Sequence, residues 1–374
     1  MRAGTSPMER NALVPKMTLS RPTGALATTA ALALGATLLA CNPAAALKYA
    51  KREHNLKPDP GIPVWVPGPV DVQPEEELHV VGADVMDEMT LGWVKMMRQA
   101  YPHLSVTMEA RASGSGGPAL TNEIAELAPV GRELLPAEAE GFRAKFGYDA
   151  TAFRVATGSV GSLGKTAASI IMVDKDNPIS CLSLQQLDDI YSTTHNRGGK
   201  EITAWGQLGA TGAWADRPIH LYGLKSPNGI EWYFKIRVMK MGDYRPGIQF
   251  TKGKGFTHAF TVAAEDMREH PGGLTYALMA NVQPYTKVMA LSEAPGGKCV
   301  LPTTQSVYDH SYPLARYVYI YVNHKPGTTL APKVREFLKA VLSREGQQQV
   351  ANDGVYIPLQ PQVVKEELAK LATM

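Results

Sequence analysis

Short apolar runs alternate with longer segments of helical periodicity along the chain from residue 78 onward. Residues 78–81 form an apolar run, and after a small-residue turn the large apolar side chains of residues 86–100 recur at helical spacing. Residues 104–110 alternate between apolar and polar side chains, as in a half-buried strand. This repeated order of strand, turn and helix predicts an α/β fold with largely parallel sheets flanked by helices.

Three turns rich in small residues each lie between a predicted strand and a predicted helix, at residues 82–84, 113–118 and 226–229. Asn228 and Glu231 have the spacing of a capping box at the start of the third of these helices. In an open α/β sheet, ligands bind beyond the carboxyl ends of the strands, where helix N-termini attract oxyanions. If the fold brings them together, the three turns form a pocket of N–H donors for a small anion.

Residues 159–166, with the sequence SVGSLGKT, nearly match the nucleotide-binding P-loop. The match fails at its first position, where Ser159 stands in place of a glycine. It fails again after the motif, because residues 167–173 have the pattern of a strand and a P-loop leads directly into a helix. We interpret the segment as a Gly-rich crossover rather than as a nucleotide site.

The N-terminus has the three-part layout of a secretory signal. Basic residues precede the uncharged stretch of residues 22–47, and residues 25–40 are an apolar core of mostly small side chains. This core is shorter and less apolar than a membrane-spanning helix. The signal has two alternative ends: residues 38–41 (LLAC) resemble a bacterial lipobox with Cys41 as the lipidated residue, whereas residues 44–46 (AAA) suit ordinary signal peptidase. Either end exports the mature chain to the periplasm, anchored at the cell envelope only in the lipidated form.

The charge of the chain excludes an electrostatic nucleic-acid binder. The 374 residues carry 38 Lys and Arg against 35 Asp and Glu, a net charge of +3. Residues 1–46 hold four of the basic and one of the acidic residues, so the remainder has 34 of each and no basic surplus. A protein that binds nucleic acid through phosphate contacts needs such a surplus.

Cysteine and histidine usage argues against a metal site. Three cysteines are too few for a disulfide scaffold, and Cys181 and Cys299 are left either as a disulfide pair or as two buried thiols. The nine histidines show no paired metal-ligand spacing. No metal and no cofactor are therefore expected.

Residues 47–77 are rich in proline and end in three glutamates, which excludes a helix or a central strand. Two structures fit this composition. One is an extended linker that holds the folded part away from a membrane. The other is a leader bound along the surface of the folded part, with Trp65 as its apolar contact.

Several segments together resemble the phosphate-binding proteins of ABC-type phosphate uptake, which have the type II periplasmic binding fold. The similar segments are residues 153–155, 170–173, 176–178, 182–187 (LSLQQL), 190–192 (IYS), 202–208 (ITAWGQL), 312–316 (YPLAR), 342–347 (LSREGQ) and 354–359 (GVYIPL). The resemblance covers residues 78–372. It implies two lobes around a cleft: residues 78–157 and 313–374 in lobe 1, and residues 166–312 in lobe 2. Residues 1–46 would be the signal peptide and residues 47–77 the linker.

In this family three loops hold the anion and hinge motion closes the cleft. Carried over one by one, the ligand-binding residues implied for this chain are Ala83, Asp84, Val85, Ser113, Gly114, Ser115, Arg132, Lys225, Asn228 and Gly229. The second loop keeps both hydroxyls of the family's GSGTG pattern, and Arg132 occupies an arginine position of one branch. The first loop lacks the hydroxyls of the usual GSxT pattern.

The third loop departs most from the family. Its usual pattern is GRxSxSGT, and this chain has Leu224 for the arginine, Asn228 for a serine and Ile230 for the threonine. Loss of a buried guanidinium partner costs about 2–5 kcal/mol, or roughly two to three decades in affinity. Two outcomes follow: phosphate affinity is weakened or the ligand has changed, or Arg111, Arg132 and Lys225 compensate.

The resemblance implies a monomeric periplasmic solute-binding protein for phosphate or a related small oxyanion, which delivers it to an inner-membrane ABC-type permease. The alternative is a diverged envelope protein that uses the binding fold for another ligand or a protein partner. An enzyme is not expected. A serine nucleophile at Ser113 or Ser115 would need an aligned base, and neither His79 nor His103 has the spacing to provide one.

Overall fold

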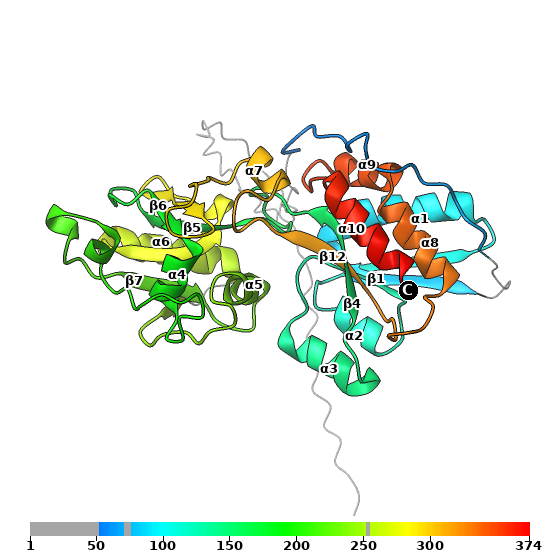
Figure 1. Ribbon diagram of the computed structural model, residues 1–374, viewed down its shortest axis with the longest axis horizontal. Helices are drawn as coiled ribbons and strands as arrows, with labels where there is room; N and C mark the ends of the chain where they lie inside the picture. The colour runs from blue at the N-terminus through cyan, green and yellow to red at the C-terminus, as the bar shows by residue number, and fades with distance from the viewer. Residues whose placement is uncertain (1–51, 71–75, 252–254) are drawn as a thin grey trace, which may run out of the picture. The chain divides into compact units, whose positions relative to one another are not determined.

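The computed structural model describes residues 52–70, 76–251 and 255–374, apart from the side chains of residues 256 and 257 (Figure 1). Two five-stranded sheets organise these residues, with strand orders β2–β1–β3–β12–β4 and β10–β5–β9–β7–β8. A short two-stranded sheet pairs β6 (Cys181–Ser183) with β11 (Ala290–Ser292). Helices accompany both larger sheets, so the α/β fold class predicted from the sequence is confirmed.

The first sheet contains the N-terminal strands and one strand from near the C-terminus. Its strands are β1 (Glu77–Ala83), β2 (Ser105–Arg111), β3 (Leu127–Val130), β4 (Thr151–Thr157) and β12 (Tyr317–Val322). Its helices are α1 (Asp87–Ala100), α2 (Gly116–Thr121), α3 (Pro136–Phe146), α8 (Pro332–Val341), α9 (Arg344–Asp353) and α10 (Pro361–Ala372). Strand β1 runs parallel to β2 in a register that pairs Glu77 with Ser105 and Ala83 with Arg111. The methionine and tryptophan stripe predicted for residues 86–100 is the buried face of α1.

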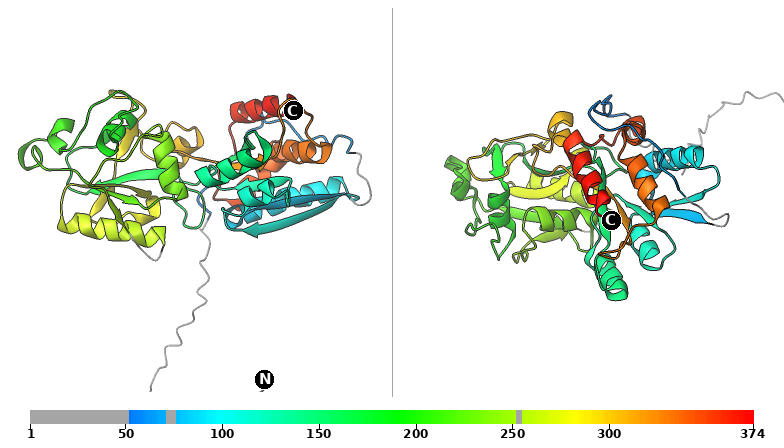
Figure 2. Two further views of the ribbon diagram at one scale, coloured as in Figure 1. Left: turned by 90° about the horizontal axis from the view of Figure 1, so that it is seen from below. Right: turned by 45° about the vertical axis from the view of Figure 1, so that its right-hand side comes forward.

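The second sheet draws its strands from the middle of the chain. They are β5 (Ser169–Asp174), β7 (His220–Leu224), β8 (Gln249–Thr251), β9 (Gly273–Leu278) and β10 (Thr286–Val288). The accompanying helices are α4 (Leu184–Tyr191), α5 (Gly229–Arg237), α6 (Phe256–Glu269) and α7 (Thr304–Tyr308), shown in green to yellow and orange in Figures 1 and 2. Strand β5 is wholly buried and pairs with β9 over five residues.

Both larger sheets are mixed, which corrects the expectation of largely parallel sheets. In the first sheet, β12 enters between β3 and β4 and runs antiparallel to both. In the second, β5 runs antiparallel to β9 and β10, while β7 is parallel to β8 and β9. The alternation of buried and exposed side chains that marks a strand is the same in either direction, so the sequence pattern carried no information on strand polarity.

Each large sheet has its own hydrophobic core. One cluster is built around Trp93, Phe337 and Tyr356, and the other around Trp205, Phe234 and Tyr276. The strands of the two five-stranded sheets divide on either side of residues 157–169 and 288–317. The exact lobe boundaries stay a prediction. We use lobe 1 for the part with the first sheet and lobe 2 for the part with the second.

The described part of the proline-rich segment, residues 52–70, is bound to the C-terminal helices of lobe 1. Arg344 Nε donates to the carbonyl of Ile62 at 3.1 Å. The backbone N–H of Trp65 donates to Glu345 Oε2 at 2.8 Å, and the centre of the Trp65 ring lies 6.3 Å from that of the Tyr101 ring. Over these residues the segment is a leader on the protein surface, which corresponds to the second of the two structures considered above.

Candidate functional site

A cavity of about 190 Å³ lies where loops of both lobes meet. Drug-sized ligands occupy pockets of about 300–1,000 Å³, so this cavity suits a smaller ligand. Its lining residues are Val85, Ser113, Gly131, Arg132, Gly164, Lys165, Thr166, Ala167, Asn228, Gly229, Ile230, Leu278 and Arg316. A larger hollow of about 350 Å³ opens elsewhere on lobe 1, beside residues 120–126 and 323–334, and contains none of the residues predicted as the anion site.

Arg132 follows strand β3 and is held by a paired contact with a carboxylate. Its Nη1 and Nη2 donate to the two carboxylate oxygens of Glu138 at 2.7 and 2.8 Å, and both side chains are 12% exposed. Glu138 also accepts the N–H of Leu135 at the start of α3, which fixes the carboxylate in place. The guanidinium is therefore oriented before any ligand arrives.

The second loop contributes one of its two predicted hydroxyls. Ser113 lines the cavity, and no other described residue accepts from or donates to its hydroxyl. The hydroxyl of Ser115 instead donates to the carbonyls of Ala112 and Gly82, at 2.7 and 3.2 Å. Ser115 and Gly114 lie outside the lining, so the loop presents Ser113 alone.

The first loop reaches the cavity only through Val85. Ala83 ends strand β1 and is buried, and Asp84 is exposed with its carboxylate accepting the N–H of Val85 at 2.9 Å. Neither Ala83 nor Asp84 lines the cavity. This loop therefore supplies an apolar wall where the family pattern has hydroxyls.

The third loop provides the N-terminus of helix α5. Asn228 caps this helix by accepting the N–H of Ile230 at 2.8 Å, and Asn228, Gly229 and Ile230 all line the cavity. Lys225 is exposed and lies outside the lining, whereas Leu224 is buried in the core of lobe 2. Successive residues of an extended segment point in opposite directions, so Lys225 does not take over the place of an arginine at residue 224.

Three polar residues that sequence reasoning missed also line the cavity: Lys165, Thr166 and Arg316. Thr166 Oγ1 donates to the carbonyl of Gly131 at 2.5 Å, and its N–H donates to Tyr356 Oη at 3.0 Å. Burial raises the pKa of Tyr356, so this phenol stays neutral. Lys165 and Thr166 stood out in the sequence only as part of the near match to a P-loop. Arg316 stood out only as part of the YPLAR segment, and neither pattern indicated that these residues line the cavity.

Comparison with known proteins decides the family. The sequence profile described as PBP superfamily domain matches residues 68–345. The phosphate-binding protein PstS of Pseudomonas aeruginosa is 34% identical over 295 residues, which cover 79% of this chain and 86% of that protein. The chain belongs to the PstS family of phosphate-binding proteins. The resemblance found in the sequence is thereby confirmed.

More distant PstS proteins are similar over shorter stretches or in fold. PstS of Staphylococcus aureus (strain MRSA252) is 27% identical over 202 residues, 54% of this chain and 56% of that protein. Among solved structures, PstS from Borrelia burgdorferi aligns with a TM-score of 0.47 at 16% identity, over 76% of this chain and 100% of that one. The PstS relatives are named as binding proteins and not as enzymes, which agrees with the expectation of no catalytic chemistry.

Each cation that lines the cavity of this PstS-family chain has a carboxylate partner behind it. Arg132 pairs with Glu138, Arg316 with Glu133 at 2.8 Å, and Lys165 with Asp353 at 2.8 Å. Among the described residues, no aspartate or glutamate lines the cavity itself. The lining therefore presents N–H and O–H donors, three of them on cations whose charge is balanced by carboxylates outside the lining, and such charged donors form strong hydrogen bonds to an anion.

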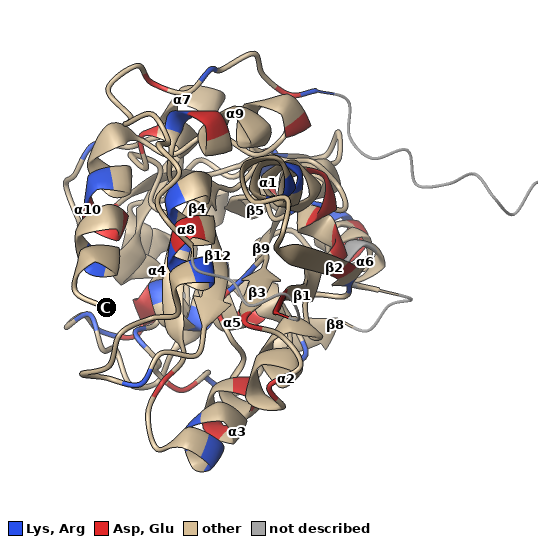
Figure 3. Ribbon diagram, turned by 90° about the vertical axis from the view of Figure 1, so that its right-hand side faces the viewer, with Lys and Arg blue, Asp and Glu red and all other residues tan. Residues whose placement is uncertain are grey.

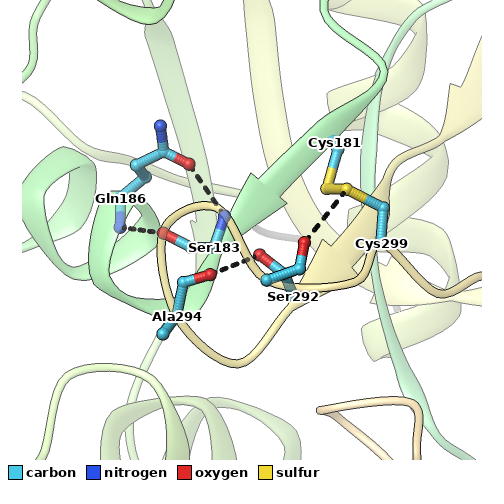
Figure 4. Close-up of a disulfide and its surroundings, with 7 residues drawn as sticks. Cys181, Ser183, Gln186, Ser292, Ala294 and Cys299 are labelled. Atoms are coloured by element: carbon cyan, nitrogen blue, oxygen red, sulfur yellow. Dashed lines mark hydrogen bonds between the residues drawn. A yellow bond between two sulfur atoms is a disulfide. The ribbon is translucent and has the colours of Figure 1, made fainter.

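Of the remaining predicted positions, Cys181 and Cys299 lie outside the cavity lining. Cys41 is outside the described residues. Cys181 and Cys299 form a disulfide with a Cα–Cα distance of 6.0 Å in lobe 2 (Figure 4). Across residues 52–70, 76–251 and 255–374 there is no group of three or more His, Cys, Asp or Glu that could hold a metal ion.

Basic and acidic residues are interspersed along α8 and α10 (Figure 3).

Proposed function

We propose that this chain is an exported solute-binding protein that takes phosphate, or a related small oxyanion, into the cavity between its lobes and delivers it to an ABC-type permease of the inner membrane. The observation that carries the proposal is the cavity of a PstS-family chain in which Arg132, Ser113 and the N-terminus of α5 come together. These three features belong to different loops, and all of them donate to anions.

The donors on the lining match the needs of a tetrahedral oxyanion. Arg132 offers a guanidinium that Glu138 and the carbonyl of Glu133 hold through Nη1 and Nη2, and its Nε has no acceptor among the described residues. A guanidinium held in this way can still donate to phosphate oxygens from its Nε side. The first N–H groups of a helix have no partner within the helix, and Asn228 takes only that of Ile230 at the start of α5. An anion that enters from solvent exchanges water for these donors, and the lobes close around it.

The finer parts of the proposal concern location and partners. The signal-like residues 1–46 support export to the periplasm, with Cys41 as the anchor if the lipobox is used. No helix within the described residues is long and apolar enough to cross a membrane. The proposed form is a monomer that carries its ligand to a membrane permease.

Calorimetric titration of the purified protein tests the proposal. Ligand carried through purification is first removed by unfolding and refolding, and phosphate is then compared with sulfate and arsenate. We expect a phosphate Kd at or below about 10 μM, a free energy near −7 kcal/mol. No heat and no thermal shift at millimolar phosphate would contradict the proposal and favour the alternative of another ligand or a protein partner.

A matched pair of variants tests whether the heat of phosphate binding arises at the cavity. Arg132 and Arg143 each pair with a carboxylate six residues further along, Glu138 and Asp149, but Arg143 lies outside the cavity lining. Arg132→Gln should lower phosphate affinity by 30-fold or more, since removal of a buried partner of a charge costs about 2–5 kcal/mol. Arg143→Gln should leave the affinity within twofold of wild type.

A further inference from the structure

The third loop supplies no guanidinium to the cavity. Leu224, at the position of the family's arginine, is buried in the lobe 2 core, and its N–H donates to Tyr276 Oη at 2.8 Å. Lys225 is exposed and outside the lining. Of the three residues that sequence reasoning offered as compensation, only Arg132 lines the cavity, because Arg111 ends strand β2 and is exposed. A second cation on the lining must come from another part of the chain.

Arg316 occupies such a place. It directly precedes strand β12, lines the cavity and is only 4% exposed. Its Nη2 donates to Glu133 Oε2 at 2.8 Å and to the carbonyl of Gly229 at 3.4 Å. Gly229 also lies against the side chain of Arg132, so the two arginines approach the same residue at the N-terminus of α5.

Part of the Arg316 guanidinium is left without a protein acceptor. Within the described residues, the hydrogen bonds of Arg316 all come from Nη2, and its Nε is buried with no partner. A guanidinium carries five N–H donors, and a buried donor without an acceptor destabilises the folded protein. Nη1 also has no acceptor among the described residues, and unlike Nε it is not sealed from the surroundings. Because the side chain lines the cavity, the occupant of the cavity is the available acceptor for Nη1.

The surroundings hold this guanidinium in position. Its carbon lies 4.4 Å from the centre of the Tyr233 ring, a cation–π distance. Burial raises the pKa of Tyr233, which stays neutral and donates its O–H to the carbonyl of Ala315 at 2.6 Å. Glu133 fixes the opposite side through Nη2. Arg316 is thus oriented in advance, as a specific anion ligand must be.

We infer that Arg316 supplies the guanidinium that the third loop of this chain lacks, and that it donates to an oxyanion held between it and Arg132. Glu133 and Tyr233 are its positioning residues. The inference rests on the proposed function, since it assigns a residue to the same site. The second arginine contact with the anion then comes from the residue that precedes β12 and not from the third loop.

The test compares Arg316→Lys with Arg154→Lys by phosphate calorimetry and thermal melting. Arg154 is a matched control: it pairs with Glu366 and Glu367, lies 5.2 Å from the centre of the Tyr317 ring, and is outside the cavity lining. Lysine keeps the charge but not the planar fork. We expect Arg316→Lys to weaken phosphate binding at least tenfold, and Arg154→Lys to change it less than twofold, whatever each does to the melting temperature.

A second variant separates ligand binding from structural support. Glu133→Gln removes the charge that neutralises Arg316 and keeps an oxygen to accept from Nη2. If Arg316 binds the anion, this variant should bind phosphate several-fold more tightly. If Arg316 and Glu133 only support the fold, affinity should fall or stay constant. This readout stands even if Arg316→Lys fails to fold.

The outcomes distinguish the inference from the proposed function. Wild-type protein that binds no phosphate would overturn both. Wild-type protein that binds phosphate, with Arg316→Lys within twofold of it or with Glu133→Gln no tighter, would overturn the inference and leave the proposed function standing. Tenfold weakening by Arg316→Lys together with an unchanged Arg154→Lys is the result that supports it.

Discussion

The side chain of Arg132 lies so close to the backbone of Gly229 that a Cβ at residue 229 would be 2.5 Å from Cδ of the arginine. Arg132 belongs to lobe 1 and Gly229 to the N-terminus of α5 in lobe 2, so this contact joins the two sides of the cavity. Real Cβ atoms essentially never approach another atom so closely. The contact therefore depends on the absence of a side chain at residue 229.

Gly229→Ala should weaken phosphate binding by tenfold or more, because either Arg132 or the α5 N-terminus must move away. Gly141→Ala is the control. Gly141 lies within α3, and a Cβ there meets no atom within 4 Å, so alanine should stabilise the helix by about 0.5–1 kcal/mol and leave binding unchanged. Calorimetric affinities and urea midpoints check both. Equal phosphate affinity in Gly229→Ala and wild type would show that the contact plays no part in binding.

Glu53 of the leader binds the crossover, residues 159–166, which carries Gly164, Lys165 and Thr166 of the cavity lining. Its carboxylate accepts from Val160 N–H at 3.1 Å, from Gly161 N–H at 3.3 Å and from the hydroxyl of Ser162. Glu53→Ala should lower the free energy of unfolding by about 1–3 kcal/mol, because it leaves these donors without their acceptor. Urea unfolding measures the loss.

The exposed Glu140, on α3, gives the control for the leader. Glu140→Ala should change the free energy of unfolding by less than about 0.5 kcal/mol, as is usual for surface substitutions. If the two variants unfold at the same urea concentration, residues 52–70 do not stabilise the crossover in solution.

His310 makes stability depend on pH. It stacks on Tyr317 with ring centroids 3.9 Å apart, and burial, aided by the charge of Arg154, lowers its pKa from 6.5 to about 4. Between these values the unfolded chain binds a proton that the folded chain does not. The contribution of His310 to stability is therefore complete above pH 6.5 and falls as the pH drops toward 4, by up to about 1.4 kcal/mol for each pH unit.

Replacement of His310 by asparagine removes this dependence. The backbone of His310 has a φ of 54°, a conformation that asparagine tolerates, and the amide can still bond to Thr157 Oγ1. The wild-type stability advantage over His310→Asn should be smaller at pH 5 than at pH 7.5. A pH-independent difference for His310→Asn would contradict the assignment.

The disulfide should stabilise lobe 2 without affecting the ligand. Cys181 begins β6, and Cys299 lies beside the antiparallel contact of Leu291 with Val300 (Figure 4). The bond closes a loop with a sequence separation of 118 residues, so replacing both cysteines with serine should cost about 2–5 kcal/mol of unfolding free energy. Phosphate affinity should not change, because neither cysteine lines the cavity. Dithiothreitol should lower the urea midpoint of wild type to that of the double variant, and an unaffected wild type would contradict the prediction.

The sequence predicted the parts of this fold that depend on local pattern. The buried face of α1 and the Asn228 cap of α5 are encoded by spacing over a few residues, and both are present, although Glu231 does not complete the capping box that its spacing predicted. Strand polarity is not encoded in this way: the buried Val318 and Ile320 of β12 alternate with tyrosines whether the strand runs parallel or antiparallel to its neighbours.

The candidate site could be predicted only in part, because it depends on which distant segments meet. Arg132 and Ser113 reach the cavity, as the family pattern implies. Arg316 follows Arg132 by almost half the length of the chain, and only the packing of β12 against β3 brings it near. Ser115 has the same chemistry as Ser113, but a backbone carbonyl within hydrogen-bonding reach takes its hydroxyl.

Crystals grown with arsenate, a heavier analogue of phosphate, test the central claim most directly. An anomalous difference map at the arsenic absorption edge locates the anion without reference to the protein coordinates. We predict one strong peak inside the cavity, within hydrogen-bonding distance of Arg132 and Arg316. A cavity without a peak at saturating arsenate, or a peak only in the larger hollow of lobe 1, would contradict the account.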